Sequence, residues 1–369
     1  MEELVDSRLF SGIYSGKTVF LTGHTGFKGA WLAEWLTQLG ASVTGFSNEL
    51  WPPPSLFAAL GLENRVRHVI GDVRNAAAIH AAVADCQPDF VFHLAAQSLV
   101  RRSYSVPTET FAVNVMGTVN LLDAVRHLAT APAVVVVTSD KCYENREWIY
   151  GYREEDQMGG HDPYSASKGC AELVASSFRR SFFQTAGSAP VATARAGNVI
   201  GGGDWAEDRI LPDCIRSLMN GQPITARRPA ATRPWQHVLE PLSGYLWLGA
   251  LLASGSAESS AYNFGPERGS TRNVGELVSE VLKHWPGTWT SPAAGGDVHE
   301  AGLLSLAIDK AHHSLRWRPV WSFERAVEAT VEWYRAVTTG QSDALHRTHA
   351  DISQYCESAQ ALGLEWARG

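Results

Sequence analysis

A tyrosine and a lysine lie four residues apart in the segment Tyr164-Ser-Ala-Ser-Lys168. This spacing places both side chains on one face of a helix. A free phenol has a pKa of about 10, and a neighbouring ammonium favours the phenolate and lowers that pKa. A tyrosine tuned in this way can remove the proton of an alcohol while a hydride leaves the same carbon. The spacing alone is common, and without further context it would indicate two exposed residues of a helix.

Ser139 supplies a context for the pair. It follows the β-branched run Val134–Val137, which is typical of a central parallel strand with both faces covered. Ligands bind at the carboxyl ends of such strands, so a hydroxyl there can hold a substrate oxygen beside the tyrosine. An acid and a possible base, Asp140 and Lys141, come next. As alternatives, Asp140 could be a helix-capping carboxylate, and Lys141 could be an exposed lysine at a strand end.

A glycine-rich loop, Gly23-His-Thr-Gly26-Phe27-Lys-Gly29, stands between an expected strand and an expected helix. Glycines permit the tight turn, and the helix N-terminus offers free N–H groups and the positive end of its dipole to a pyrophosphate. We therefore expect Gly23, Gly26, Phe27 and Gly29 to line a dinucleotide site.

The elements that must position these residues alternate along the first half. Strands are expected at Lys17–Thr22, Ala41–Phe46, Val66–Ile70, Phe90–Leu94 and Ala133–Val137, with helical patterns between them, notably Val113–Leu128. This alternation predicts an α/β fold with a doubly wound parallel sheet, of the Rossmann type.

The second half of the sequence has a less regular pattern of expected strands and helices. A strand is expected at Val191–Arg195, followed by loop-rich stretches and helices at Pro241–Ala253, Val274–Trp285 and Phe323–Ala336. We expect a smaller C-terminal α/β substrate lobe. The division is residues 1–190 for dinucleotide binding and residues 191–369 mainly for substrate, with some segments returning to the first domain. The tail after about residue 340 is expected to be helical.

Composition excludes several classes. The chain has 369 residues, is 45% hydrophobic and carries a formal charge of -7, so nucleic-acid binding is not expected. The longest apolar stretch, Leu246–Ala253, is shorter than the ~20 residues that span a bilayer. The N-terminus is acidic where a secretory signal is basic. The 5 cysteines form no CxxC pair, so neither a disulfide scaffold nor a metal site is expected. A cytoplasmic enzyme fits best.

The choice of dinucleotide depends on two positions. Ser47-Asn48-Glu49 follow the second strand, and no Arg or Lys lies there to hold a 2′-phosphate, which favours NAD over NADP. Asp72 ends a strand and could accept a hydrogen bond from an adenine amine, although a helix N-cap is an equal alternative.

These motifs together resemble the extended short-chain dehydrogenase/reductase family over nearly the whole chain. The matching segments are the GxxGxxG loop, His93-Leu-Ala-Ala96, Asn114, YxxxK, Asn198 and Ile308-Asp-Lys310…Leu315-Arg-Trp317-Arg-Pro319. The resemblance implies NAD as cofactor, a structural role for Asn114, and an NAD site lined by the loop glycines, Asp72, Val73, Leu94, Ala95, Ala96, Tyr164 and Lys168.

Within that family, the residues after Ser139 resemble those of nucleotide-sugar 4,6-dehydratases, whereas epimerases generally carry small, non-ionisable residues there. The deoxythymidine- and guanosine-linked dehydratases carry Glu at the position of Lys141. The lysine, with Gly197–Trp205 and Arg233–Tyr245, resembles the members that act on CDP-glucose. The preference for cytosine rests on this resemblance alone.

The resemblance implies a role for each catalytic candidate. Tyr164 would take the C4 hydroxyl proton, Ser139 would orient that oxygen, and Lys168 would hold the nicotinamide ribose. Lys141 would remove the C5 proton while Asp140 protonates the departing C6 hydroxyl. An ammonium is no base, so Lys141 must be neutral in that role; alternatively it stays charged and stabilises the enolate.

A nucleotide-diphosphate sugar also needs donors outside the sheet edge. Asn198 matches the family position that meets the pyrophosphate, and Arg233 is the best candidate for a bidentate phosphate clamp. Arg209 is a weaker candidate, with a solvated helix arginine as its alternative. Gln97 and Ser98 could reach the sugar. The resemblance also implies a homodimer paired through the helix near Val113–Leu128 and the helix that bears Tyr164.

Four alternative functions remain open from the sequence. A nucleotide-sugar 4-epimerase and a dehydratase acting on a dTDP- or GDP-linked sugar share the scaffold. A net NAD(P)H-consuming reductase would exchange its cofactor in each cycle. An inactive NAD-sensing regulator would be expected to lose Tyr164 or Lys168, and both are present.

Overall fold

The computed structural model describes residues 6, 8–49, 54–291 and 302–368. Most of the N-terminal segment used above to argue against a secretory signal lies outside them. A 7-stranded sheet of order β11-β6-β5-β4-β1-β2-β3 forms the centre, with all neighbours parallel. Its strands are β1 Thr18–Thr22, β2 Ser42–Ser47, β3 Arg67–Ile70, β4 Phe90–His93, β5 Ala133–Val137, β6 Val191–Arg195 and β11 Ala261–Asn263. The predicted doubly wound parallel sheet is confirmed.

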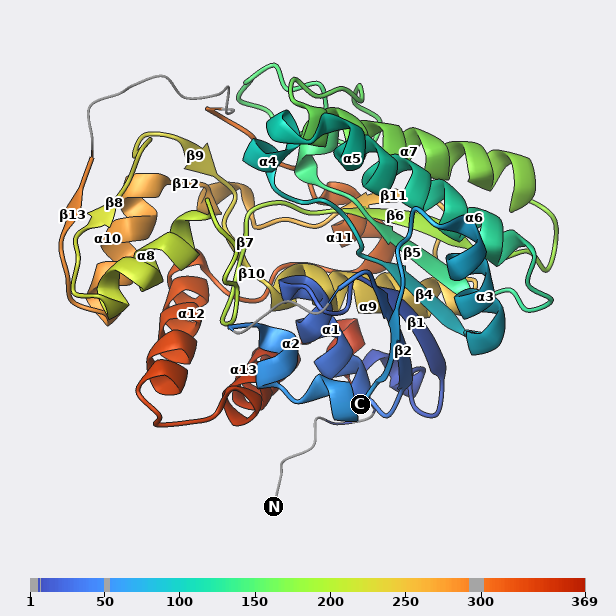
Figure 1. Ribbon diagram of the computed structural model, residues 1–369, viewed down its shortest axis with the longest axis horizontal. Coiled ribbons are helices and arrows are strands. Elements are labelled where there is room, and N and C mark those ends of the chain that lie inside the picture. Colours follow the sequence, from blue (N-terminus) through green and yellow to red (C-terminus); the bar gives the residue numbers. More distant parts are fainter. Residues whose placement is uncertain (1–5, 7, 50–53, 292–301, 369) are drawn as a thin grey trace.

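Helices cover both faces of this sheet (Figure 1). On β1, Val19 and Leu21 join the core beneath α1 (Phe27–Gln38) and α9 (Leu239–Ala253). Phe20, between them, joins the core beneath α3 (Ala76–Cys86), α6 (Gly117–Arg126) and α7 (Pro163–Phe182). Successive side chains of a strand point to opposite faces, so two covered faces explain the continuous apolar runs of the strands.

The helix expected at Val113–Leu128 does not run evenly. After α4 (Val100–Ser105) and α5 (Pro107–Phe111), residues Ala112–Met116 form a π-helical turn that leads into α6. Asn114 lies in that turn. Its side chain accepts a hydrogen bond from Gln97 N at 2.9 Å and donates to Gln97 O at 3.0 Å and to Ser167 Oγ at 2.8 Å. Asn114 therefore joins the loop after β4 to the helix that carries Tyr164.

A smaller lobe lies beside the sheet (Figure 1, left). It contains α8 (Ile210–Met219), α10 (Val274–His284), α12 (Phe323–Thr338) and the strand pairs β7 (Val199–Ile200) with β10 (Gln236–His237), β9 (Thr232–Arg233) with β12 (Arg272–Asn273), and β8 (Ile224–Thr225) with β13 (Trp289–Thr290). Because β6, β11 and α9 belong to the central sheet layer, the second half of the chain contributes to both parts. The division at residue 190 stays a prediction.

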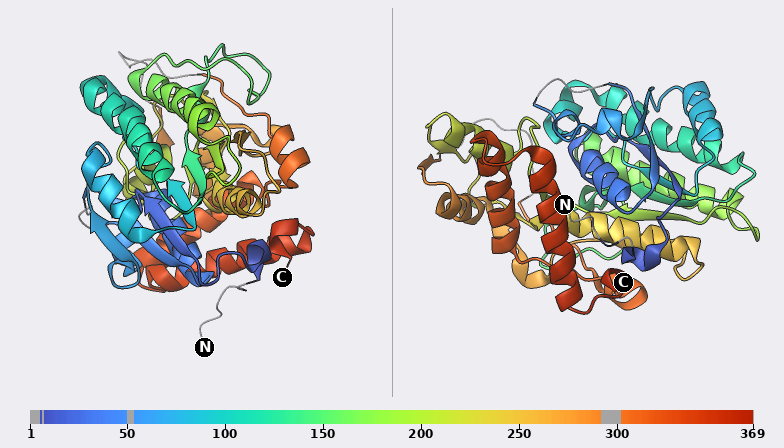
Figure 2. Two further views of the ribbon diagram at one scale, coloured as in Figure 1. Left: turned by 90° about the vertical axis from the view of Figure 1, so that its right-hand side faces the viewer. Right: turned by 90° about the horizontal axis from the view of Figure 1, so that it is seen from below.

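The tail is helical, as expected, and returns to the first helices of the chain (Figure 2). After α11 (Asp309–Leu315), helix α13 (Ala344–Ala361) places His349 Nε2 2.7 Å from Glu34 Oε1 on α1. Trp366 stacks on Phe10, with ring centroids 5.1 Å apart. The remaining short elements are α2 (Leu56–Ala59) and the 3-10 turns Leu9–Gly12, Leu62–Asn64, Asp140–Cys142, Arg268–Ser270 and Glu365–Ala367. No helix among the described residues is long and apolar enough to cross a membrane.

Candidate active site

Ser139, Tyr164 and Lys168 come together at the carboxyl end of β5. Ser139 directly precedes a 3-10 turn, Asp140–Cys142, and lies close enough to the Tyr164 hydroxyl to lower the pKa of that phenol. Lys168 Nζ lies 3.4 Å from Val137 O on the same strand. All three side chains are buried. The constellation predicted from the spacing is therefore present as a contiguous group.

The start of α7 explains why Tyr164 occupies this place. Asp162 is the N-cap, and its carboxylate accepts hydrogen bonds from Ser165 N at 3.0 Å and Ser165 Oγ at 2.6 Å. Pro163 follows at the first helical position, where its missing N–H costs nothing. Tyr164 and Lys168 then share one face of the first two turns, the face that meets β5.

Burial dominates the electrostatics of Tyr164 and Lys168. Burial raises the pKa of Tyr164 to about 12, the neighbouring Ser139 hydroxyl opposes the rise, and the Asp140 carboxylate adds to it. Burial lowers the pKa of Lys168 to about 8. Among the protein's own groups, desolvation of the phenolate thus outweighs the neighbouring cations. A pKa lowered by Lys168 together with an oxidised nicotinamide stays a prediction. A phenolate at neutral pH needs further positive charge beside it.

Asp140 is fully buried and lies among three polar neighbours. Its carboxylate accepts hydrogen bonds from Ser139 Oγ at 3.0 Å, Asn198 Nδ2 at 3.2 Å and Lys141 Nζ at 3.4 Å. The alternative reading of Asp140 as a helix cap is wrong, because Ser139 caps the turn by accepting from Lys141 N. Lys141 is partly exposed, so its ammonium lies between the buried acid and solvent.

Two residues that follow β6, Gly197 and Asn198, pack against Asp140. A Cβ on Gly197 would lie 1.8 Å from Asp140 Oδ2, so only glycine fits there. Asn198 follows with a φ of 44° in the left-handed region, which asparagine tolerates better than most residues. The structure thus places Asn198 against Asp140, a contact that the sequence did not suggest. Its predicted contact with a pyrophosphate stays a prediction.

The glycine loop forms the cradle that a pyrophosphate needs. Gly23 has a φ of 74°, and a Cβ there would lie 2.8 Å from Ala95 N. A Cβ on Gly29 would lie 2.1 Å from Gly23 O. Gly26 is the N-cap of α1, Phe27 opens the helix, and no acidic residue occupies its first turn. Thr22 Oγ1 accepts from Leu94 N and Ala95 N, both at 3.1 Å, which fixes the neighbouring segment through Ala96. These features fit a dinucleotide.

Replacing Gly29 with alanine should therefore destabilise the loop and weaken NAD binding. A forced contact of this kind costs about 1–3 kcal/mol. Gly269→Ala is the matched control, since a Cβ there meets nothing within 4 Å. Thermal unfolding and NAD+ titration of both variants check the expectation. Equal melting temperatures and equal NAD+ affinities in the two variants would contradict it.

Lys28, inside the glycine loop, was not among the predicted residues. Its Nζ donates to Tyr245 Oη at 3.2 Å beneath the site. Burial lowers its pKa to about 7, and the charges of Arg209, Lys168 and Lys141 contribute while Asp140 opposes. These mutual influences place Lys28 among the catalytic side chains. The sequence feature that could have identified Lys28 is the presence of a lysine within the glycine-rich loop.

Asp72 and Val73 lie at the end of β3. Asp72 forms an ion pair with Arg74, with Arg74 Nη2 2.6 Å from Asp72 Oδ2, and this arginine lowers the pKa of the carboxyl. The N-cap of α3 is Asn75, so the alternative of Asp72 as a helix cap is wrong. Val73 is buried beside Gly117. An adenine contact of Asp72 stays a prediction.

Gln97 and Ser98 are the two predicted substrate residues that follow β4. The Gln97 amide is committed to its own loop, accepting from Leu99 N at 2.7 Å and donating to Leu99 O at 3.1 Å and Thr110 Oγ1 at 3.0 Å. The predicted contact of Gln97 with the sugar stays a prediction. Ser98 Oγ lies 3.4 Å from Arg209 Nη2 instead.

Both predicted arginines are held in place. Arg209 precedes α8 as its N-cap, and its Nη1 lies 3.0 Å from Asp204 Oδ2. Its side chain is 35% exposed, so both the phosphate contact and the alternative of a solvated arginine stay open. Arg233 is buried on β9, where its Nη1 donates to Thr232 O at 2.8 Å. Both therefore present guanidinium groups fixed by neighbouring residues, as phosphate binding requires.

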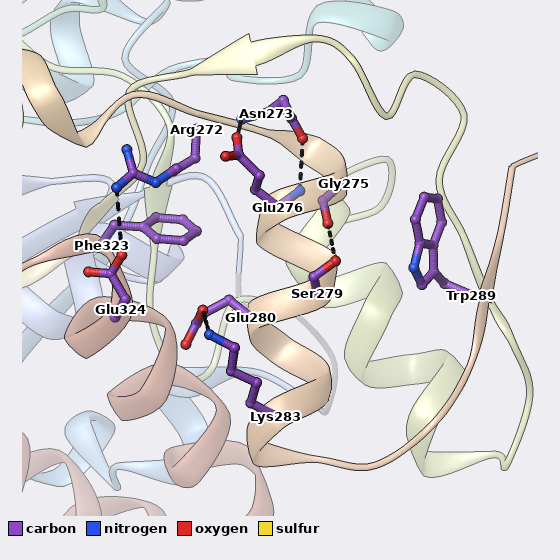
Figure 3. Close-up of a pocket in the computed structure, with 10 residues that line it drawn as sticks. All are labelled: Arg272, Asn273, Gly275, Glu276, Ser279, Glu280, Lys283, Trp289, Phe323 and Glu324. Carbon is purple, nitrogen blue, oxygen red and sulfur yellow. Dashed lines mark hydrogen bonds and ion pairs between the residues drawn. The ribbon is translucent and has the colours of Figure 1, made fainter.

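A separate pocket on the small lobe contains none of the predicted residues (Figure 3). Its charged side chains pair with one another: Arg272 with Glu324 at 3.7 Å, and Lys283 with Glu280 at 2.6 Å. Asn273 and Glu276 form the capping box of α10. Within the described ranges, no cluster of His, Cys, Asp and Glu could hold a metal ion. The candidate site is therefore the one at the end of β5.

Comparisons with known proteins agree with this choice. A family model described as GDP-mannose 4,6 dehydratase matches residues 20–285. A CDP-glucose 4,6-dehydratase of Salmonella typhimurium is 47% identical over 349 residues, covering 93% of this chain and 97% of the relative. A dTDP-glucose 4,6-dehydratase of Xanthomonas campestris is 26% identical over 342 residues, covering 86% and 93%.

Solved structures are similar as well. A dTDP-glucose 4,6-dehydratase from Streptomyces venezuelae, with NAD and TYD bound, superposes with a TM-score of 0.73 at 25% identity, covering 89% of this chain and 99% of that chain. An epimerase from Methanothermobacter thermautotrophicus superposes with a TM-score of 0.75 at 24% identity, covering 89% and 94%. The second likeness concerns the fold alone.

Proposed function

The chain belongs to the GDP-mannose 4,6-dehydratase family, within the extended short-chain dehydrogenases/reductases, and on that premise we propose that it converts CDP-D-glucose to CDP-4-keto-6-deoxy-D-glucose. It is an NAD-dependent lyase in this proposal. The reaction oxidises C4, eliminates water across C5 and C6, and reduces C6, so the cofactor returns to its starting state.

The observation that carries the proposal is the 47% identity to a CDP-glucose 4,6-dehydratase over nearly the full length of both chains. Relatives that act on dTDP-glucose are 25–28% identical. A dTDP- or GDP-linked substrate and a 4-epimerase are less favoured for that reason. The acid and the lysine that follow Ser139 also argue against an epimerase, whose keto-sugar must turn freely in the site.

Tyr164 and Ser139 would act on the C4 hydroxyl. Ser139, which lies beside the Tyr164 hydroxyl, would orient the substrate oxygen, and Tyr164 would take its proton. NAD, when bound, would supply the hydride acceptor for C4 and the hydride donor for C6. The positive charge that the phenolate needs comes from Lys168 together with the oxidised nicotinamide. The loop glycines, Asp72, Val73 and Leu94–Ala96 would hold the dinucleotide.

Asp140 and Lys141 would eliminate water once the ketone has made the C5 proton acidic. Asp140 is buried at the end of β5, and its carboxyl group would protonate the departing C6 hydroxyl. Lys141 Nζ lies 3.4 Å from it, so one side chain can meet C5 while the other meets the C6 oxygen. Lys141 is either the base at C5 or a charged stabiliser of the enolate.

Arg233, Arg209, Asn198 and Ser98 would hold the nucleotide-diphosphate sugar. Arg233→Ala should raise the KM for CDP-glucose by about tenfold to a hundredfold, since a charge-assisted contact to a phosphate contributes about 1.5–3 kcal/mol. NAD+ affinity should stay at the wild-type value. Steady-state kinetics and NAD+ titration measure the two quantities, with Arg126→Ala, on the outer face of α6, as control. An unchanged KM would refute the clamp.

The proposal includes a homodimer and a cytoplasmic location. Four large apolar side chains on α5, the π-turn and α7 are exposed: Phe111, Met116, Leu173 and Phe182. These elements lie side by side (Figure 1), and a second copy would cover an apolar surface of this kind. The cysteines are all free, which suits a reducing compartment.

The deciding experiment incubates the protein and NAD+ with CDP-, dTDP-, GDP- and UDP-glucose and with GDP-mannose. Each mixture is then scanned after alkali for the near-ultraviolet absorbance of a 4-keto-6-deoxy sugar. We expect a signal with CDP-glucose alone. A signal with another nucleotide would show that the enzyme prefers a different base. Absence of a signal in all five mixtures would contradict the proposed dehydratase activity. Epimerised sugars in silent mixtures would then favour the epimerase.

A further inference from the structure

Helix α7 carries a buried carboxylate one turn beyond Lys168. Glu172 is 3% exposed and lies on the helix face that meets β5 and β6. Its Oε2 accepts hydrogen bonds from Thr193 Oγ1 at 2.7 Å and Arg195 Nη2 at 2.8 Å, and its Oε1 accepts one from Thr138 Oγ1. The chemistry described above makes no use of this residue.

Arg195 extends the contacts to the far side of the site. Its Nη1 donates to Tyr143 Oη at 2.6 Å and to Glu154 O at 2.9 Å. Tyr143 in turn donates to Asn263 Oδ1 at 2.7 Å on β11. The Glu172–Arg195 pair thus joins α7, β5, β6 and β11 to the segment that follows Lys141.

A buried ion pair is an expensive way to hold elements together. Removing two charges from water costs several kcal/mol per ion, and apolar residues of similar volume often stabilise a fold as well. The position of this pair suggests why it is here. Thr138, which donates to Glu172, directly precedes Ser139, and Lys168 lies four residues before Glu172 on the same helix. One carboxylate therefore contacts both elements that supply the catalytic groups.

We propose that the Glu172–Arg195 ion pair is a positioning device for the dehydration proposed above. It holds the helix of Tyr164 and Lys168 in register with the strand end of Ser139, and its carboxylate keeps Lys168 in the ammonium form. The catalytic consequence rests on the proposed function, whereas the effect on Lys168 can be measured without any turnover.

The charges around Lys168 support the second part. Burial lowers the pKa of Lys168 and the Glu172 carboxylate opposes that fall. Cys142, on the turn after β5, stays a neutral thiol because burial raises its pKa well above the usual value. His93 on β4 is likewise neutral, with its pKa lowered to about 3 by burial and by Lys168. Lys28 on α1 is a neighbouring basic group, and burial, Arg209 and Lys168 lower its own pKa to about 7. Glu172 is thus the anion that sustains the Lys168 charge.

Glu172→Gln tests the charge with little change of shape. The amide keeps the side-chain size, removes the anion and leaves the Arg195 cation uncompensated. We expect the pKa of Lys168 to fall by about one unit, equivalent to about tenfold in its protonation equilibrium. Glu172→Asp keeps the anion and should leave Lys168 close to wild type. The double variant Glu172→Gln with Arg195→Gln removes both charges, so Lys168 should titrate between wild type and the single variant.

The readout is a pH titration of the NAD-loaded full chain by lysine-selective 13C NMR. Lys168→Arg identifies the Lys168 signal by its loss. Glu280→Gln is the matched control, because Glu280 is another buried carboxylate paired with a lysine, on α10; Lys168 should titrate there as in wild type. If Glu172→Gln does not fold, the double variant decides by the same comparison with wild type.

The pH profile of kcat for CDP-glucose then separates positioning from mere stability. We expect its alkaline limb to move to lower pH in Glu172→Gln, in step with the NMR titration, and to return in Glu172→Asp. An unchanged Lys168 titration in Glu172→Gln would overturn the inference, even if the variant melts at a lower temperature. Absence of wild-type turnover would instead sink the proposed function, and the NMR comparison would still decide the role of Glu172.

Discussion

Tyr164→Phe is expected to lower kcat for the dehydration of CDP-glucose by about a thousandfold, within the range that general base catalysis contributes. The ring is buried against β5 and α7, and phenylalanine keeps that packing while losing the one group that can take the C4 proton. The affinity for CDP-glucose and the melting temperature should therefore stay close to wild type. Because the loss precedes oxidation, no reduced nicotinamide should form in a single turnover.

Stopped-flow absorbance of the reduced nicotinamide and quantification of the product measure the two steps. Tyr104→Phe serves as control, since that tyrosine lies on α4 with 37% of its surface exposed, and it should retain full activity. A Tyr164→Phe enzyme that works within tenfold of the wild-type rate would assign the base to another residue.

Asp140→Asn is expected to separate the two halves of the reaction. Asparagine keeps the size of the side chain and can still meet Asn198 and Ser139, but it has no acidic proton for the C6 hydroxyl. Elimination should slow by about a hundredfold, whereas C4 oxidation should continue. The variant should therefore accumulate reduced nicotinamide after CDP-glucose is added, where the wild-type enzyme shows only a transient.

Lys141→Met is the companion variant that distinguishes the two roles left open for the lysine. In D2O, a base at C5 exchanges the C5 proton with solvent, so its removal should abolish deuterium uptake. A charged stabiliser makes uptake slower without ending it. Water loss at the wild-type rate in Asp140→Asn would show that Asp140 is not the acid. The same result in Lys141→Met would exclude any direct role of the lysine.

The sheet and the catalytic group could be predicted because their signals are local. Each of the strands expected in the first half begins and ends within a residue of its expected limits. The signal is clearest for β5, which is apolar throughout because it is covered on both faces. Tyr164 and Lys168 share a helix, and Ser139, Asp140 and Lys141 are consecutive. Their assembly needs only the rule that ligands meet the carboxyl ends of parallel strands.

What the sequence did not show depends on which elements are neighbours in space. Glu172 and Arg195 come together only because β6 lies beside β5, and Asn198 meets Asp140 for the same reason. The burial of Tyr164, which raises the pKa of its phenol, cannot be judged from spacing. Nor could the sequence show that Leu99 and Thr110 hydrogen-bond to the amide of Gln97.

The return of the C-terminal segments to the N-terminal ones bears on how the protein is made. A ribosome that has completed residues 1–190 has released five strands of the sheet, but not α9, which covers one face, nor α13, which reaches Glu34. The apolar side chains of α1, among them Trp31 and Trp35, stay uncovered until then. Such a surface favours aggregation and chaperone capture during synthesis. The NAD-binding half is therefore expected to mature only when translation is nearly finished, and to fail as an independent fragment.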